Sequence, residues 1–95
     1  MMIAYLVNEY LSQHDMSIQT MAKKLGFSDK QVRHWTRGLH VPYRFSAECL
    51  VTLFLKDIAE KHKREYEDVF WHIWKLDAKI HRKSRTVMNS SLSGE

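Results

Sequence analysis

The sequence predicts a compact all-α domain of five helices, followed by a short disordered tail. Only one Pro and three Gly interrupt the 95 residues, so the chain carries few helix breakers. Apolar residues recur three and four positions apart over most of the chain, which is the period of an amphipathic helix. A hydrophobic share of 44% suits a single domain over residues 1–83. Residues 84–95 (SRTVMNSSLSGE) are Ser-rich and without period, and we expect them to be disordered.

The first two helices follow from apolar spacing and from one capping residue. Residues 3–13 place apolar side chains on one face, which predicts the first helix. Ser17 is suited to cap the N-terminus of the second helix. The inner face of that helix consists of Ile18, Met21, Ala22 and Leu25.

A tight turn over residues 26–28 leads into the third helix. Gly26 can adopt the positive φ that ends a helix. Gly38, twelve residues later, can end the following helix in the same way. Ser28 with Gln31 three residues on is the capping-box pattern, so we expect a helix over residues 28–37. Val32 and Trp35 lie on one face of it and are predicted to pack inward, as is Phe27 from the turn.

The second half of the chain predicts a loop, a central helix and a terminal helix. Residues 39–45 contain Pro42 and show no helical period, so we expect a loop anchored by its apolar residues Leu39, Val41 and Phe45. Ser46 is predicted to cap a fourth, largely buried helix. Residues 60–65 (EKHKRE) mark either a break or a solvated turn within one helix. We favour a break, with the fifth helix over about 65–83.

Charge is concentrated in two regions of the chain. The formal net charge is +4. Residues 16–44 carry six Lys or Arg against Asp29 alone, and a second basic excess lies in residues 70–95. This distribution suits a polyanionic partner.

Several functional classes find no support in the sequence. Cys49 is the single Cys, and the chain carries no secretory leader and no apolar run of about 20 residues, so a cytoplasmic location is expected. The six His are not spaced as metal ligands, and we expect no metal and no cofactor. Nucleophile motifs and phosphate loops are absent from the sequence, so an enzyme is not expected.

The pattern A-x3-G-x5-V-x2-W-x2-G, from Ala22 to Gly38, resembles the helix-turn-helix of the Xre/Cro/CI family of lambdoid phage repressors and Cro proteins. The resemblance centres on residues 18–38 and extends over about residues 1–75. It implies a five-helix lambda-repressor-like domain and a sequence-specific transcriptional regulator of a phage, mobile element or bacterium. Such a protein reads the major groove of double-stranded DNA, here with residues 28–37. The sequence departs from the family at two positions. Ile18 stands where many members have a Gln that touches DNA, and Thr36 stands where an acid is common.

The outward face of the third helix supplies the candidates for base reading. A guanidinium can bond both O6 and N7 of guanine, so Arg33 is the first choice. The resemblance implies the same role for neighbouring residues at the start and middle of the helix. The full predicted set is Ser28, Asp29, Lys30, Arg33, His34 and Arg37, of which Asp29 is equally suited to help the helix N-terminus and Arg37 to bind phosphate. The predicted phosphate contacts are Gln19, Lys23, Lys24, Tyr43 and Arg44.

The fifth helix carries an unusual number of aromatic residues. Phe70, Trp71 and Trp74 are either core residues or an interface, and a wide apolar helix at the end of a small domain favours an interface. A homodimer would require a near-palindromic operator. The alternative is a protein-interaction module, an antitoxin or a repressor modulator, that binds a protein partner through this helix.

Overall fold

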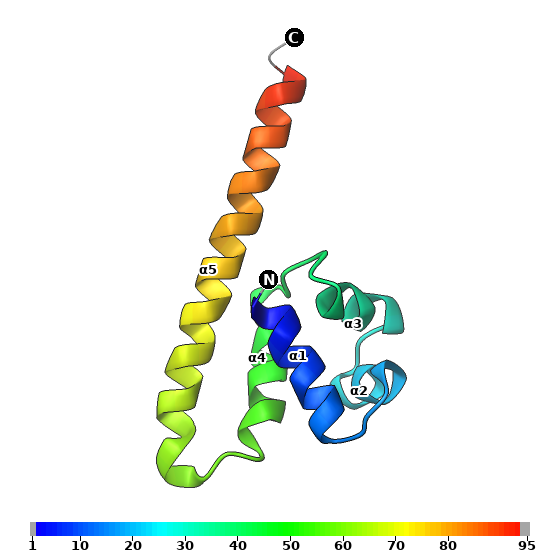
Figure 1. The fold of residues 1–95 in the computed structure, drawn as a ribbon, viewed down its shortest axis with the longest axis vertical. Helices are drawn as coiled ribbons and strands as arrows, with labels where there is room; N and C mark the ends of the chain where they lie inside the picture. The colour runs from blue at the N-terminus through cyan, green and yellow to red at the C-terminus, as the bar shows by residue number, and fades with distance from the viewer. Residues whose placement is uncertain (1, 94–95) are drawn as a thin grey trace.

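The secondary structure consists of five α-helices (Figure 1). In this computed structural model the backbone is described for residues 2–93 and the side chains for residues 2–80. The helices run α1 (Met2–Gln13), α2 (Ile18–Leu25), α3 (Asp29–Thr36), α4 (Arg44–Leu55) and α5 (Glu60–Ser93). In Figure 1, α2 and α3 lie on one side of α1 and α4, and the long α5 lies on the other. The all-α class and the five helices confirm the sequence prediction.

One hydrophobic core joins all five helices. Met21 and Ala22 of α2 meet Val32 and Trp35 of α3, as their spacing predicts, and all four are at most 4% exposed. The α4 helix is central to the core, since its inward side chains are buried along its length. The complete buried set is Ile3, Val7, Leu11, Met21, Ala22, Val32, Trp35, Ala47, Leu50, Val51, Leu53, Phe54 and Phe70.

The start of α1 is held by a side chain from α5. Asp77 is 2% exposed, and its carboxylate accepts hydrogen bonds from the backbone N–H of Ile3 at 2.8 Å and of Met2 at 3.3 Å. The first N–H groups of a helix have no partner within the helix, and an anion there also suits the helix dipole. Asp77 therefore caps α1 across the domain and fastens α5 to it.

The boundaries of α4 and α5 differ from those the sequence predicts. The α4 helix begins at Arg44 with Tyr43 as its N-cap, so Ser46 is a buried residue inside the first turn and not the cap. The predicted break exists, but it falls at residues 56–59, and α5 already begins at Glu60. The charged residues 60–65 form a solvated first part of that helix, in which Glu60 and Lys63 pair at 3.0 Å.

The predicted loop is also anchored differently. Of the predicted anchors, Leu39 and Phe45 are 52% and 69% exposed and Val41 is half-buried, whereas Pro42 is the buried residue of this segment. The carbonyl of Pro42 accepts a hydrogen bond from the Trp74 indole at 2.8 Å. This bond ties the loop to α5, which the sequence pattern of the loop alone does not reveal.

The backbone of α5 is helical up to Ser93, past residue 84 where the tail is predicted to begin. Residues 60–93 contain neither Gly nor Pro, and Gly94 is the first helix breaker. Residues 84–93 have no apolar period, so the sequence does not predict that they pack through one face. This lack does not prevent their backbone from being helical. Among the described residues, no helix combines the length and apolarity needed to span a membrane.

Candidate nucleic-acid interface

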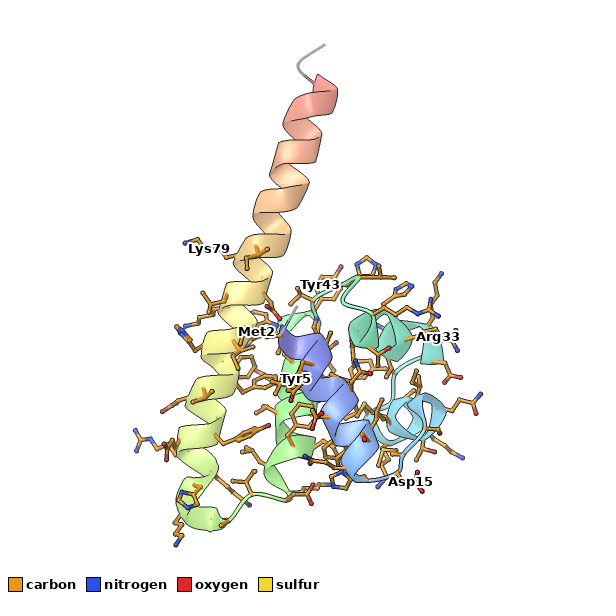
Figure 2. All side chains as sticks on the ribbon, in the orientation of Figure 1. Met2, Tyr5, Asp15, Arg33, Tyr43 and Lys79 are labelled. Carbon is orange, nitrogen blue, oxygen red and sulfur yellow. The ribbon has the colours of Figure 1, made fainter. Side chains whose placement is uncertain are left out.

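Two short helices, α2 and α3, place a basic surface on the side of the domain away from α5 (Figures 1 and 2). Gly26 ends α2 with φ +80°, a left-handed conformation that glycine adopts at little cost, and its N–H bonds the carbonyl of Ala22 at 2.9 Å. Phe27 in the turn packs edge-on against Trp35 of α3, with ring centroids 5.6 Å apart. The turn and its aromatic contact fix how α3 leaves α2.

The N-terminus of α3 is closed by the predicted capping box. The Ser28 hydroxyl accepts from the Gln31 N–H at 3.2 Å, and the Gln31 side chain accepts from the Ser28 N–H at 3.2 Å. Ser28 is thus engaged in the cap, although it was predicted to read bases. Asp29 is half-buried in the first turn, where an acid favours the helix dipole.

The C-terminal end of α3 is held from α1. The Asn8 amide donates to the carbonyl of Thr36 at 2.9 Å and to that of Ala4, also at 2.9 Å. Last-turn carbonyls of a helix lack partners within it, so this bond satisfies one of them and fixes the helix end. Gly38 follows with φ +68°, which confirms its predicted place just past the helix.

Three cations project from the outer face of α3. Lys30, Arg33 and Arg37 are exposed, whereas Val32 and Trp35 on the opposite face are buried. Figure 2 shows Arg33 at the outer edge of the domain, on the side opposite α5. The helix therefore presents guanidinium and ammonium groups from a backbone that is fixed at both ends.

His34 lies beside these cations and against the following loop. Its ring centroid is 4.8 Å from that of His40, and both residues line a hollow of about 200 Å³ between α3 and the loop. Partial burial in this position lowers the pKa of His34, and neighbouring positive charge lowers it further. The charges responsible belong to His40, Lys30, Arg37 and Arg33. An anion brought to this surface would oppose the effect of those positive charges on the pKa.

Most of the predicted phosphate contacts are exposed. Gln19, Lys23 and Lys24 lie on the outer side of α2, and Lys24 also lines an open groove between α2 and α4. Tyr43 is 82% exposed at the start of α4. These side chains are accessible to a large ligand.

Arg44 is placed differently from the prediction. Its guanidinium lies over the Trp71 ring, 4.2 Å from the centroid, and its Nε is 3.4 Å from the Glu48 carboxylate. The Arg44 side chain keeps 60% exposure, but its charged group is already engaged within the chain. It ties α4 to α5, so it is a weaker candidate for a phosphate contact than the cations of α3.

The predicted aromatic interface on α5 is largely internal. Phe70 is 1% exposed and belongs to the core, so its assignment to an interface is wrong. Trp71 and Trp74 are half-buried, packed edge-on to each other and covered in part by Arg44 and Pro42. Their apolar surface stabilises the loop and the start of α4.

Sequence reasoning missed two supporting residues, Asn8 and Asp77. Each bonds a residue that is distant in sequence. Where side chains are described, no group of three or more His, Cys, Asp or Glu is placed to hold a metal ion. Comparison with protein-family models, with curated proteins and with solved structures finds no match, so function has to be argued from the residues themselves.

Proposed function

We propose that this protein binds double-stranded DNA in a sequence-specific way and regulates transcription. In this proposal α2, its Gly26 turn and α3 act as a helix-turn-helix, with α3 in the major groove. The observation that carries the proposal is the two-faced α3 helix: Val32 and Trp35 are buried, and Lys30, Arg33 and Arg37 are exposed. One helix with an apolar inner face and a cationic, hydrogen-bonding outer face is what reading a groove requires.

The rigidity of α3 adds support. The Ser28–Gln31 cap holds its start and the Asn8 bond to Thr36 holds its end. Side chains mounted on a fixed helix lose less conformational freedom on binding than those on a loop. The resemblance of residues 18–38 to the Xre/Cro/CI family points to the same use of this helix.

The proposal divides roles among the cations. Arg33, in the middle of α3, is the proposed base reader, because it can contact guanine through two hydrogen bonds, worth about 1–3 kcal/mol of discrimination. Lys30, Lys23 and Lys24 are proposed to bind phosphates, which position the protein without reading sequence. Arg37 caps the C-terminal end of α3 through its backbone and is free to serve either role with its side chain.

The test is a salt-titrated binding assay on random-sequence duplex DNA, followed by selection of bound sequences. Wild type is expected to bind, with log K falling against log salt by about 0.9 for each phosphate contacted. Arg33→Ala is expected to lose preference for the selected site while keeping most of its non-specific affinity. The matched control is Lys61→Ala, which removes one exposed cation from α5 and is expected to leave preference unchanged.

Two outcomes would overturn the proposal. One is an absence of binding by wild type at low salt. The other is an equal loss of DNA affinity in Arg33→Ala and Lys61→Ala with no change in sequence preference. Only the net charge of the protein would then matter. The alternative, an antitoxin or repressor modulator that binds a protein partner through α5, stays a prediction. It receives less support, because Phe70 is buried in the core and Trp71 and Trp74 are partly buried against it.

A further inference from the structure

The hollow between α3 and the loop that follows it combines hydrogen-bonding side chains with an apolar wall. It includes Tyr43, which Figure 2 shows at the edge of the domain, and its volume is about 200 Å³. At about 30 Å³ for each water-sized group, the hollow has room for a small molecule of about seven such groups. This is enough for a small metabolite but too little for a nucleotide.

Ser46 is the least exposed polar residue that lines the hollow. It lies in the first turn of α4, is 5% exposed, and its hydroxyl forms no hydrogen bond with any described residue. Among the described residues, no fully enclosed side-chain N or O atom lacks a partner, so this hydroxyl is not fully enclosed. The hollow is therefore where the hydroxyl can meet a partner. A buried polar group without one carries a cost that a ligand would relieve.

The surroundings of the hollow favour an anion. The side-chain oxygen of Gln31 already accepts from the Ser28 N–H, so the amide NH₂ of Gln31 is the group left for a ligand. None of the described residues that line the hollow is acidic. Burial lowers the pKa of His34, and nearby positive charges lower it further: those of His40, Lys30, Arg37 and Arg33. The same charges would attract a negatively charged ligand.

The apolar wall of the hollow favours a ligand that also has a hydrocarbon part. Trp35 is 4% exposed and Val41 is half-buried, and both line the hollow. An inorganic anion or a phosphate group of DNA would gain nothing from this wall. A hydrocarbon group placed against it would leave water, which favours binding.

We infer that the hollow binds a small organic acid. Its carboxylate accepts hydrogen bonds from the Ser46 hydroxyl and the Gln31 amide, and its short hydrocarbon part lies against Trp35 and Val41. A bound carboxylate adds negative charge beside the cationic face of α3, so it weakens the attraction of that face for DNA. Ligand binding itself does not require DNA, whereas its effect on DNA affinity rests on the proposed function.

A titration followed by NMR tests the class of ligand. Acetate, propionate and butyrate are added at neutral pH and constant ionic strength, with inorganic phosphate as the anion that lacks a hydrocarbon part. The amide signals of Val41 and Ser46 are expected to shift. Each added CH₂ group is expected to tighten binding about three- to fourfold, and phosphate is expected to bind more weakly than butyrate. Equal affinities for phosphate and butyrate would overturn the inference, because the apolar wall would then play no part.

A pair of hydroxyl deletions in α4 tests the site. Ser46→Ala is expected to weaken butyrate binding about fivefold, which is the loss expected for one hydrogen bond. Thr52→Ala is the matched control, since Thr52 is exposed on the same helix and outside the hollow, and it should leave butyrate binding unchanged. Equal butyrate affinities of Ser46→Ala and wild type would overturn the assignment.

A DNA-binding titration with and without saturating butyrate tests the effect on DNA. Butyrate is expected to lower the DNA affinity of wild type about fivefold at constant ionic strength, and an unchanged affinity would overturn this effect. Ser46→Ala is expected to keep the wild-type DNA affinity when butyrate is absent. If Ser46→Ala instead weakens DNA binding as much as butyrate binding, the hollow serves a DNA phosphate and the inference is overturned. A wild-type protein that binds butyrate but no DNA would refute the proposed function and leave the ligand site supported.

Discussion

Replacing Asp77 tests how α5 is joined to the domain. The buried carboxylate accepts one short and one longer hydrogen bond, from the N–H groups of Ile3 and Met2. A hydrogen bond to a charged group contributes about 1.5–3 kcal/mol, and the longer bond contributes less. Asp77→Ala removes both bonds but also removes the cost of burying a carboxylate, which offsets part of the loss. We expect a net loss of about 2 kcal/mol in the free energy of unfolding.

Urea and thermal unfolding monitored by circular dichroism measure this loss. A change of about 2 kcal/mol corresponds to a fall in Tm of about 8–16 °C for a chain of this size. Asp77→Asn keeps one carbonyl acceptor and is expected to lose about half as much. Asp68→Ala removes an exposed acid from the same helix and is expected to stay within about 0.5 kcal/mol of wild type.

The comparison is made at one protein concentration, because self-association would stabilise the folded state by mass action. If Asp77→Ala unfolds at the same urea concentration as Asp68→Ala, the carboxylate does not fasten α1 to α5, and the reasoning is refuted. Equal losses of stability from Asp77→Asn and Asp77→Ala would refute the claim that the loss depends on how many hydrogen bonds to the N-terminus of α1 are removed.

Three further predictions concern the site and its support. Burial, and then neighbouring positive charge, lower the pKa of His34, and bound phosphates would offset the charge and so favour proton uptake. DNA affinity is therefore expected to rise as pH falls from about 7.5 toward 6, and His34→Gln should flatten a binding titration repeated across that range. Gly26→Ala is expected to cost about 1–2 kcal/mol in thermal unfolding, since its φ is +80° and nothing lies within 4 Å of an added Cβ, so the whole cost is conformational. Trp74→Phe keeps most of the ring but loses the 2.8 Å bond to the Pro42 carbonyl, and urea unfolding should show a loss of about 1 kcal/mol.

Local signals explain which parts of the fold the sequence predicts. Ser17 caps α2 by accepting from the Thr20 N–H at 3.1 Å, and Ser28 pairs with Gln31 three residues on. Both bonds join near neighbours in the chain, so residue type and spacing are enough to predict them. The buried positions Val32 and Trp35 follow in the same way from the helical period.

Bonds between distant residues explain what the sequence does not predict. Asp77 bonds Ile3 from 74 positions away, Trp74 bonds Pro42 from 32, and Asn8 bonds Thr36 from 28. No local pattern encodes such pairs, because they depend on how whole helices pack. The placement of Arg44 is misjudged for the same reason, since its contact with Trp71 exists only where α5 passes the start of α4.

The same difference between local patterns and contacts of distant residues applies to the candidate site. The exposure of Lys30, Arg33 and Arg37 follows from the period of α3, so the basic surface itself is predictable. The pairing of His34 with His40 is not, because it depends on the path of the loop after α3. The aromatic residues of α5 are a similar case: they are visible in the sequence, but the packing of whole helices decides that Phe70 is buried in the core.

The α1 helix connects α3 to α5. Its Asn8 holds the C-terminal end of α3, and its first N–H groups are held by Asp77 of α5. One helix of 12 residues therefore fixes the position of α3, with its cationic face, relative to α5. If two copies pair through α5, the orientation of each α3 relative to the two-fold axis is set through α1. The spacing of the two half-sites on DNA would then depend on these hydrogen bonds as much as on the residues that touch the bases.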